Sequence, residues 1–180
     1  MRHYKKLEEY GIIGNLKTIA LISNDGPIDW FCMPYIESES VFAGILDIEK
    51  GGHFSIQPVQ PFESMQKYIQ KTNILQTMFS NPAGFVTVTD FMPVQLKDSE
   101  ETVIYRKITC TEGHVDLRLI FKPRFDYARV ETFVNAESQS NSGIAAKKEK
   151  IIQPSISCEN PYTEAIAYKT LQNWIQETRL

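Results

Sequence analysis

The sequence predicts an all-β fold, a mostly antiparallel β-sandwich of the super-sandwich type with a carboxy-terminal α-helix. Residues 114–121 alternate between polar and apolar side chains, which is the pattern of a half-buried strand. Residues 24–26 and 81–84 contain the Asn, Asp, Gly and Pro of tight turns between β-prone segments. Residues 160–180 carry apolar side chains at helical spacing.

The amino-terminal half is expected to form short strands joined by turns. Residues 17–23 are apolar and β-prone, and Asp25-Gly26 tolerates the positive φ of a hairpin turn, so that 27–33 form the returning strand. Residues 40–46 are expected to form one helical turn behind a Ser cap. A glycine pair ends that turn, and residues 53–57 form the next strand.

The middle of the chain predicts four more strands. Residues 73–80 and 85–91 flank the turn at 81–84. Residues 102–110 are rich in β-branched and aromatic side chains. In 114–121 the apolar residues fall on one face and the polar residues on the other, as alternate positions of a strand do. Strands at this spacing are typical of sandwiches and barrels.

The chain is expected to divide into three parts. Residues 1–134 form the β-sandwich domain, 135–159 are a polar loop with a poorly matched segment, and 160–180 form the terminal helix. Asn160 can cap this helix, and Pro161 suits its first position because the missing N–H has no helical partner there. Its apolar stripe consists of Ala167, Leu171, Trp174 and Ile175.

Composition restricts the partners. The chain has 180 residues and a formal net charge of -3, which gives no electrostatic case for nucleic acid or an anionic membrane. Three widely spaced cysteines without a CxxC pair favour thiols over a metal or disulfide framework. No apolar segment has the character of a signal peptide or a membrane span. We therefore expect a cytoplasmic protein with no metal and no cofactor.

Five short blocks give a sharper prediction. They occur in one order along the chain, at residues 10–15, 25–34, 51–56, 88–93 and 123–127. Together they resemble the trehalase-like amino-terminal domain of family 15 glycoside hydrolases, the bacterial and archaeal glucoamylase and trehalase type. The chain departs from the family at Ile36-Glu37, where Phe-Asp is usual, and the resemblance fades after Arg129. Residues 170–174 faintly resemble the linker helix of the family.

The resemblance implies an α-glucosidic bond as the substrate and hydrolysis with inversion, which needs a general acid and a general base. In the family both are glutamates on a helical barrel. Since this chain ends at Leu180, we expect no catalytic residue in it and no activity of the chain alone. It would support the barrel and its active-site mouth. The alternatives are a free-standing carbohydrate-binding or interaction module, and a remnant of a truncated hydrolase gene.

Four residues are candidates for substrate binding, since sugars stack on aromatic rings and bond to carboxylates: Asp29, Trp30, Tyr35 and Glu37. The structural alternative is that Trp30 fills the core, that Asp29 satisfies backbone donors and that Glu37 is solvated. Asp25 is expected to make the turn, and the histidines are expected to be structural or exposed.

Arg124, Asp126 and Trp174 are candidates for contact with the barrel, and the first two could instead form an ion pair with each other. The expected partners are the sugar, the barrel in the same chain and a second copy of this chain in a homodimer. The dimer is expected because a sheet without its barrel leaves strand edges and apolar surface uncovered. The alternative is a monomer whose terminal helix covers the exposed face.

Overall fold

The computed structural model describes residues 2–94 and 102–132 in full. Beyond them it describes only the backbone of short strands, at 134–135, 146–147, 150–152, 155–157 and 165–167.

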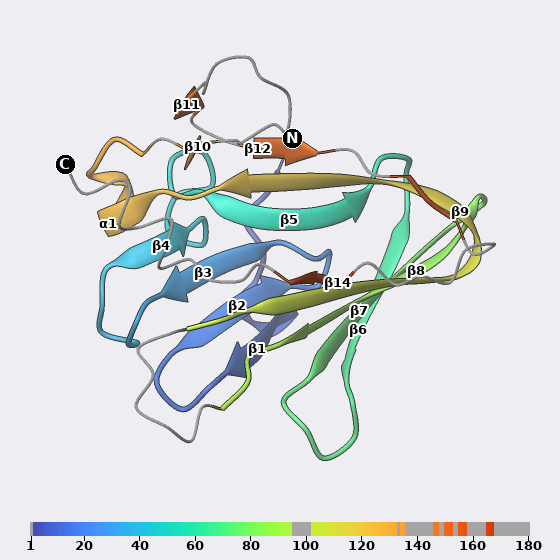
Figure 1. Cartoon of the computed structure of the whole chain (residues 1–180), viewed down its shortest axis with the longest axis horizontal. Helices are drawn as coiled ribbons and strands as arrows, with labels where there is room; N and C mark the ends of the chain where they lie inside the picture. The colour runs from blue at the N-terminus through green and yellow to red at the C-terminus, as the bar shows by residue number, and fades with distance from the viewer. Residues whose placement is uncertain are drawn as a thin grey trace.

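The fold is built almost entirely from antiparallel strands (Figure 1). In chain order the elements are the 3-10 turn Leu7–Glu9, β1 Tyr10–Gly14, β2 Ile19–Ser23, β3 Ile28–Cys32, β4 Ser40–Ala43, β5 His53–Pro58, β6 Glu63–Tyr68, β7 Leu75–Asn81, β8 Gly84–Phe91, β9 Tyr105–Lys122, α1 Phe125–Ala128, β10 Val134–Asn135, β11 Ala146–Lys147, β12 Lys150–Ile152, β13 Ser155–Ser157 and β14 Ala165–Ala167. The main sheet runs β1-β2-β3-β5-β9-β8-β7-β6, with β4 beside β3 and with β12, β13 and β14 beside β9. The all-β, antiparallel prediction is confirmed.

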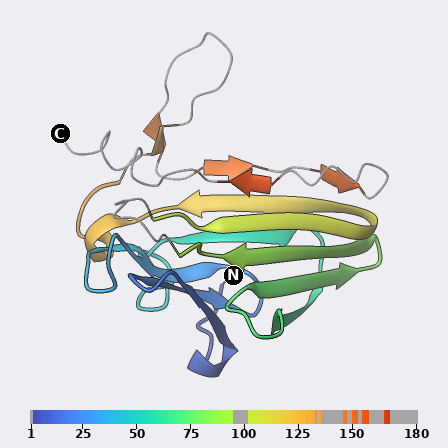
Figure 2. The ribbon, with the colours of Figure 1, turned by 60° about the horizontal axis from the view of Figure 1, so that its bottom comes forward.

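The sheet curves into a nearly closed barrel rather than a clear two-layer sandwich (Figure 2). Its first and last strands, β1 and β6, meet through side chains. The Tyr68 hydroxyl accepts a hydrogen bond from the Ile12 N–H at 2.7 Å and donates one to the Ile12 carbonyl at 2.9 Å. Asn73 donates to the Gly14 carbonyl at 2.8 Å. These bonds satisfy the backbone of the β1 edge where no neighbouring strand does so.

Strand β9 replaces the two strands predicted at 102–110 and 114–121. Its first half pairs with β8 and its second half pairs with β5, so it joins the two parts of the sheet. The strand turns at Gly113, whose φ is +69° and where a Cβ would lie 2.0 Å from the Ala83 carbonyl oxygen. Glycine is required there because other residues rarely adopt positive φ and no room exists for a side chain.

The predicted alternation in β9 is confirmed. Its apolar side chains at positions 115, 117, 119 and 121 are buried, whereas those at 114, 116 and 118 are exposed. The buried set joins one core with side chains from β1, β2, β3, β4, β5, β7 and β8. The core sits inside the curved sheet, and in the second half of β9 the outer face is left to polar residues.

Residues 40–46 do not form the predicted helical turn. Ser40–Ala43 is strand β4, paired with β3, and all four of its residues are buried. Phe42 packs against Phe31 with 6.5 Å between ring centroids and edge-on against Phe121 at 5.7 Å. Packing of an apolar segment on both faces favours a strand over the local helical preference.

The structure also differs from the prediction in the terminal helix and in the number of strands. Ala165–Ala167, inside the predicted helix 160–180, is strand β14 paired with Tyr105–Lys107 of β9, so the helix does not hold at these three residues. The remainder of that range lies outside the described residues. The described helix is α1, directly after β9. Strands β1 and β6 were not predicted; Glu63–Tyr68 is mostly polar, with Met65 and Tyr68 as its apolar side chains.

Within the described residues, no helix has the length and apolar character needed to cross a membrane. In the same part of the chain, no group of three or more His, Cys, Asp or Glu side chains could hold a metal ion.

Candidate functional site

A polar pocket lies between the amino-terminal segment and the sheet. Its cavity is about 380 Å³, at the small end of the volumes of ligand sites. Charged and polar side chains predominate among its lining residues, which are Arg2, His3, Lys5, Ser23, Asp25, Asp29, His53, Ser55, Gln57, Pro58, Arg118 and Ile120.

Strand β5 provides one wall of the pocket. His53, Ser55 and Gln57 occupy alternate positions, so they share the outer face, while Phe54 and Ile56 point into the core. His53 and Ser55 are nevertheless buried, at 7% and 2% exposed. Outward-facing polar residues in a sheet are usually solvated, so their burial shows that this face is covered.

Strand β9 continues the same wall. Arg118 pairs across the ladder with Gln57, and Ile120 pairs with Ser55. Arg118 lines the pocket and is exposed, so we assign this residue to the rim of the pocket and not to its floor.

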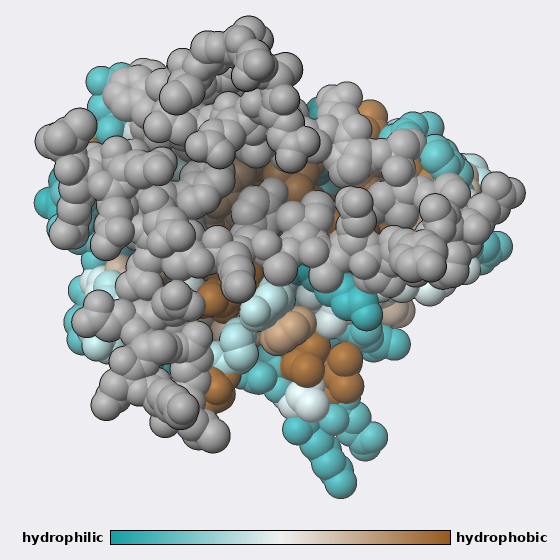
Figure 3. All heavy atoms as spheres, viewed as in Figure 1, coloured by the Kyte–Doolittle hydropathy of each residue, from teal (hydrophilic) through white to brown (hydrophobic). Residues whose placement is uncertain are grey.

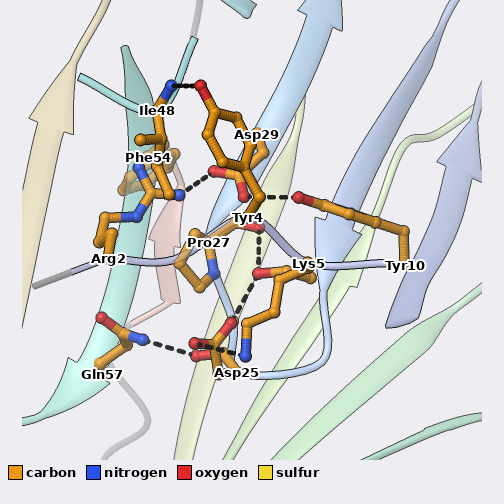
Figure 4. A network of polar contacts seen from close by, with 12 residues as sticks. Arg2, Tyr4, Lys5, Tyr10, Asp25, Pro27, Asp29, Ile48, Phe54 and Gln57 are labelled. Carbon is orange, nitrogen blue, oxygen red and sulfur yellow. Dashed lines mark hydrogen bonds and ion pairs between the residues drawn. The ribbon is translucent and has the colours of Figure 1, made fainter. Parts of the chain in front are cut away.

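Asp29 lies at an irregularity in β3. Leu21 of β2 pairs with Trp30 and Ile22 pairs with Ile28, so Asp29 is an extra residue between two pairs. Such a bulge redirects a side chain out of the regular alternation. Asp29 is 3% exposed, and its carboxylate accepts hydrogen bonds from the Arg2 guanidinium and, at 3.0 Å, from the Tyr10 hydroxyl (Figure 4).

The two carboxylates of the pocket are each paired with a cation. Burial raises the pKa of Asp29 above its usual value, although the Arg2 guanidinium opposes this. Burial of the Tyr10 hydroxyl, reinforced by the Asp29 carboxylate beside it, raises the pKa of Tyr10. Asp25, in the hairpin turn as predicted, lies 3.2 Å from the Lys5 ammonium and accepts a hydrogen bond from the Ser23 hydroxyl at 2.7 Å. The amino-terminal segment is thus fixed to the sheet by two ion pairs.

His53 is neutral in this pocket. Burial, reinforced by the positive charges of Arg2, Lys122 and Arg124, lowers its pKa from 6.5 to about 3. Its Nδ1 atom and the Nη1 atom of Arg2 are buried, and neither has a hydrogen-bond partner within the described residues. Unsatisfied buried polar atoms are uncommon in folded proteins, so this pair marks the pocket.

A second group of side chains surrounds Trp30. The half-buried Trp30 ring lies 6.1 Å from the Tyr127 ring, tilted by 44°. Residues 126–128 all have φ between +50° and +62°, a left-handed run without glycine. Such strain is kept only where surrounding contacts impose it. The Tyr127 N–H donates to the Ser40 hydroxyl at 2.9 Å, and Arg129 lies over the Tyr127 ring at 5.6 Å.

The candidate substrate residues do not converge on one point. Asp29 contacts Arg2 and Tyr10, whereas Trp30 contacts Tyr127. Tyr35 and Glu37 are exposed on the loop between β3 and β4, where the Tyr35 N–H donates to the Ser38 hydroxyl at 3.1 Å. Their roles in sugar binding stay predictions.

Of the candidates for barrel contact, Asp126 forms its ion pair with Arg129 and not with Arg124. Arg124 donates to the Pro123 carbonyl at 2.7 Å. Trp174 lies outside the described residues.

Sequence reasoning missed Arg2, Tyr10 and Tyr127. A terminal arginine carries no local signal of a partner 27 positions away. Of the two alternatives expected for His53, structural or exposed, the second is wrong, because its side chain is buried. The polar residues at alternate positions 53, 55 and 57 could have indicated a polar strand face, but not that the amino-terminal segment covers this face.

The comparisons with known proteins agree with one another. The family model described as trehalase-like, N-terminal matches residues 2–156. The chain is 36% identical over 146 residues to a trehalase of Thermoplasma volcanium, which covers 74% of this chain and 22% of that protein. It is 37% identical to a trehalase of Thermoplasma acidophilum, over 71% of this chain and 24% of the relative.

A more distant match is an uncharacterized glycosyl hydrolase of Methanocaldococcus jannaschii, 26% identical over 92% of this chain and 28% of the relative. None of the solved structures matches the chain. The chain spans about a quarter of the length of the relatives that it matches. On the family match and these identities, the chain belongs to the trehalase-like amino-terminal domain family.

Proposed function

We propose that this chain is the non-catalytic amino-terminal domain of a glucoamylase- or trehalase-like enzyme of glycoside hydrolase family 15, which acts on an α-glucosidic bond. The observation that carries the proposal is the match of residues 2–156 to a domain that forms about a quarter of proteins named trehalases. The acid and base that hydrolysis needs would then belong to the rest of such an enzyme.

The face around Trp30 is the one that we expect to meet the catalytic barrel. Strand β3 carries Trp30, β4 pairs with β3, and α1 packs on β4, so the strained turn with Asp126 and Tyr127 lies beside that ring. Arg124 directly precedes this turn, and the exposed Tyr35 and Glu37 lie on the loop that joins β3 to β4. Exposed aromatic rings with nearby charges suit both a protein contact and a sugar ring.

A chimaera tests the proposal. This chain would replace the matching 22% of the Thermoplasma volcanium trehalase, and trehalose hydrolysis would be measured for the chimaera, for the trehalase lacking that part and for this chain alone. We expect hydrolysis by the chimaera and none by the other two. Hydrolysis by this chain alone would contradict the proposal, as would a folded chimaera without activity.

The chimaera, together with a binding measurement on the isolated chain, also tests the alternative of a free-standing carbohydrate-binding module. The contact between the half-buried Trp30 ring and the exposed Tyr127 ring is the observation that favours it. Calorimetric titration of the isolated chain with trehalose and maltose should then show binding that Tyr127→Ala removes, together with an inactive chimaera.

A homodimer is proposed as well. Large apolar side chains are exposed along the seam between β1 and β6, among them Ile12 (48%), Met65 (61%) and Tyr68 (45%). Figure 3 shows hydrophobic surface on the lower half of the molecule, over the region of β1, β6 and β7. Light scattering after size exclusion should give twice the chain mass, and Met65→Lys should return it to the monomer mass. We also propose a cytoplasmic location, for which the unpaired buried thiol of Cys32 is the support.

A further inference from the structure

We propose that the pocket beneath the amino-terminal segment binds a small sugar-derived anion, a compact molecule that carries several hydroxyl groups and one carboxylate or phosphate. The site is distinct from the Trp30 face. The proposal does not rest on the function proposed above, because it concerns binding by this chain itself.

Charge is the first argument. Three cationic side chains, Arg2, Lys5 and Arg118, line the pocket against two carboxylates, Asp25 and Asp29. The carboxylates are paired with Lys5 and Arg2, which leaves Arg118 with no ion pair among the described residues. The chain as a whole has a net charge of -3, so this surplus of positive charge is local and does not reflect composition. With both carboxylates already paired, the remaining positive charge of the pocket attracts ligands of the opposite sign.

The buried polar atoms without partners are the second argument. His53 is 7% exposed and lines the pocket, and its Nδ1 atom has no hydrogen-bond partner within the described residues. The Nη1 atom of Arg2 is likewise buried and has no hydrogen-bond partner within the described residues, although the Nη2 atom of Arg2 is bonded to Asp29. A buried donor without a partner is costly, and an anionic oxygen in the pocket is the strongest acceptor that could satisfy it.

The remaining groups match hydroxyls. No hydrogen bond of the Ser55 hydroxyl lies within the described residues, and it belongs to the same wall as His53. Gln57 donates to the Asp25 carbonyl at 2.9 Å, so its amide oxygen is fixed in position. The Asp25 carboxylate beside it accepts hydrogen bonds. Alternating donors and acceptors recognise the vicinal hydroxyls of a sugar skeleton, whereas a bare anion uses donors alone.

The cavity limits the ligand to a small one. A volume of about 380 Å³ is at the low end for ligand sites, and the apolar contribution to its lining comes chiefly from Pro58 and Ile120. A monosaccharide derivative fits these limits better than an oligosaccharide, which would need a long groove or an aromatic platform.

The test measures binding to the full chain by calorimetry and by the shift in melting temperature. The four probes are glucose 6-phosphate, gluconate, glucose and inorganic phosphate. We expect at least one of the two anionic sugars to bind at least tenfold more tightly than both glucose and inorganic phosphate. A preference for glucose 6-phosphate identifies a phosphate ester, and a preference for gluconate identifies a carboxylate. Failure of all four probes, or inorganic phosphate binding as tightly as the anionic sugars, would overturn the proposal.

Two variants assign the binding to this pocket. Arg118→Gln removes the rim cation, which makes no described ion pair, and should weaken binding at least tenfold with the fold intact. Lys67→Gln, an exposed cation on β6, removes the same charge away from the pocket and should leave binding unchanged. Equal weakening by both variants would mean diffuse charge attraction and would refute the site. Because this test measures binding and not trehalose hydrolysis, a failure of this proposal can be distinguished from a failure of the chimaera.

Discussion

Replacement of Arg106 by Met should remove a large part of the stability of this fold. Arg106 and Asp90 are both fully buried, and they face each other across β8 and β9. The Nε and Nη2 atoms of Arg106 donate to the two carboxylate oxygens at 2.8 and 3.1 Å. The same guanidinium donates to the carbonyls of Phe54 at 2.8 Å and Gly26 at 2.5 Å. One side chain therefore fastens a hairpin turn, β5, β8 and β9 together.

The cost follows from what the Met side chain leaves behind. Asp90 would be buried without its partner, which typically costs about 3 to 5 kcal/mol, and two buried carbonyls would lose their donors at roughly 1 to 3 kcal/mol each. Because relaxation and protonation of Asp90 reduce the sum, we expect a loss of about 4 to 6 kcal/mol. Burial already raises the pKa of Asp90, despite Arg106, which favours that protonation. A domain with a stability of about 5 to 15 kcal/mol would thereby lose between about a quarter and all of it.

Urea unfolding followed by tryptophan fluorescence measures the effect. The double variant Arg106→Met with Asp90→Leu leaves no buried charge, so it should be less destabilised than the sum of the two single variants by at least about 1 kcal/mol. Lys6→Met is the control, because Lys6 and its partner Glu8 are 78% and 77% exposed, and it should have no measurable effect. A loss below about 1 kcal/mol for Arg106→Met, or strict additivity in the double variant, would refute the reasoning.

Three further predictions concern the pocket wall, the seam and the β9 turn. Since the pKa of His53 is lowered to about 3 in the folded protein, the unfolded state binds a proton below about pH 6.5 and the folded state does not. The free energy of unfolding should fall by up to about 5 kcal/mol as the pH drops from 6.5 towards 3, and the same pH slope in His53→Gln would contradict this. Tyr68→Phe removes both hydrogen bonds to Ile12 and should cost about 1 kcal/mol and speed amide exchange at Ile12 in NMR; unchanged exchange would argue against closure by this side chain. Gly113→Ala forces a Cβ to 2.0 Å from a carbonyl oxygen at φ +69° and should cost at least about 1 kcal/mol, so an unaltered melting temperature would show that β9 turns differently.

Several features of the fold could be read from the sequence because they depend on local patterns. The alternation of 114–121 and the turns at 24–26 and 81–84 need only neighbouring residues for their physical reason. The family blocks were likewise visible in the chain alone, and the family match confirms them. Elements without such a pattern were missed. Strand β6 lacks a buried apolar face because it is an exposed strand at the end of the sheet, so its sequence does not alternate.

The candidate site shows the same division. Asp29 and Trp30 could be chosen from residue type and from the family block, but their partners could not. The Arg2–Asp29 ion pair joins residues 27 positions apart, and Trp30 contacts a ring 97 positions away, in a left-handed turn that no local preference favours.

The sequence by itself determined the β class, the main turns and the family of this protein, because periodicity, turn chemistry and short motifs act over a few residues. Only the tertiary structure decided that the sheet closes through Tyr68, that 40–43 form a strand around Phe42, and that Asp29 and His53 are buried beneath the amino-terminal segment. The physical reason is that burial and ion pairing depend on what lies across the molecule. A residue's own neighbours in the chain carry no signal of the charge or backbone group that will face it after folding.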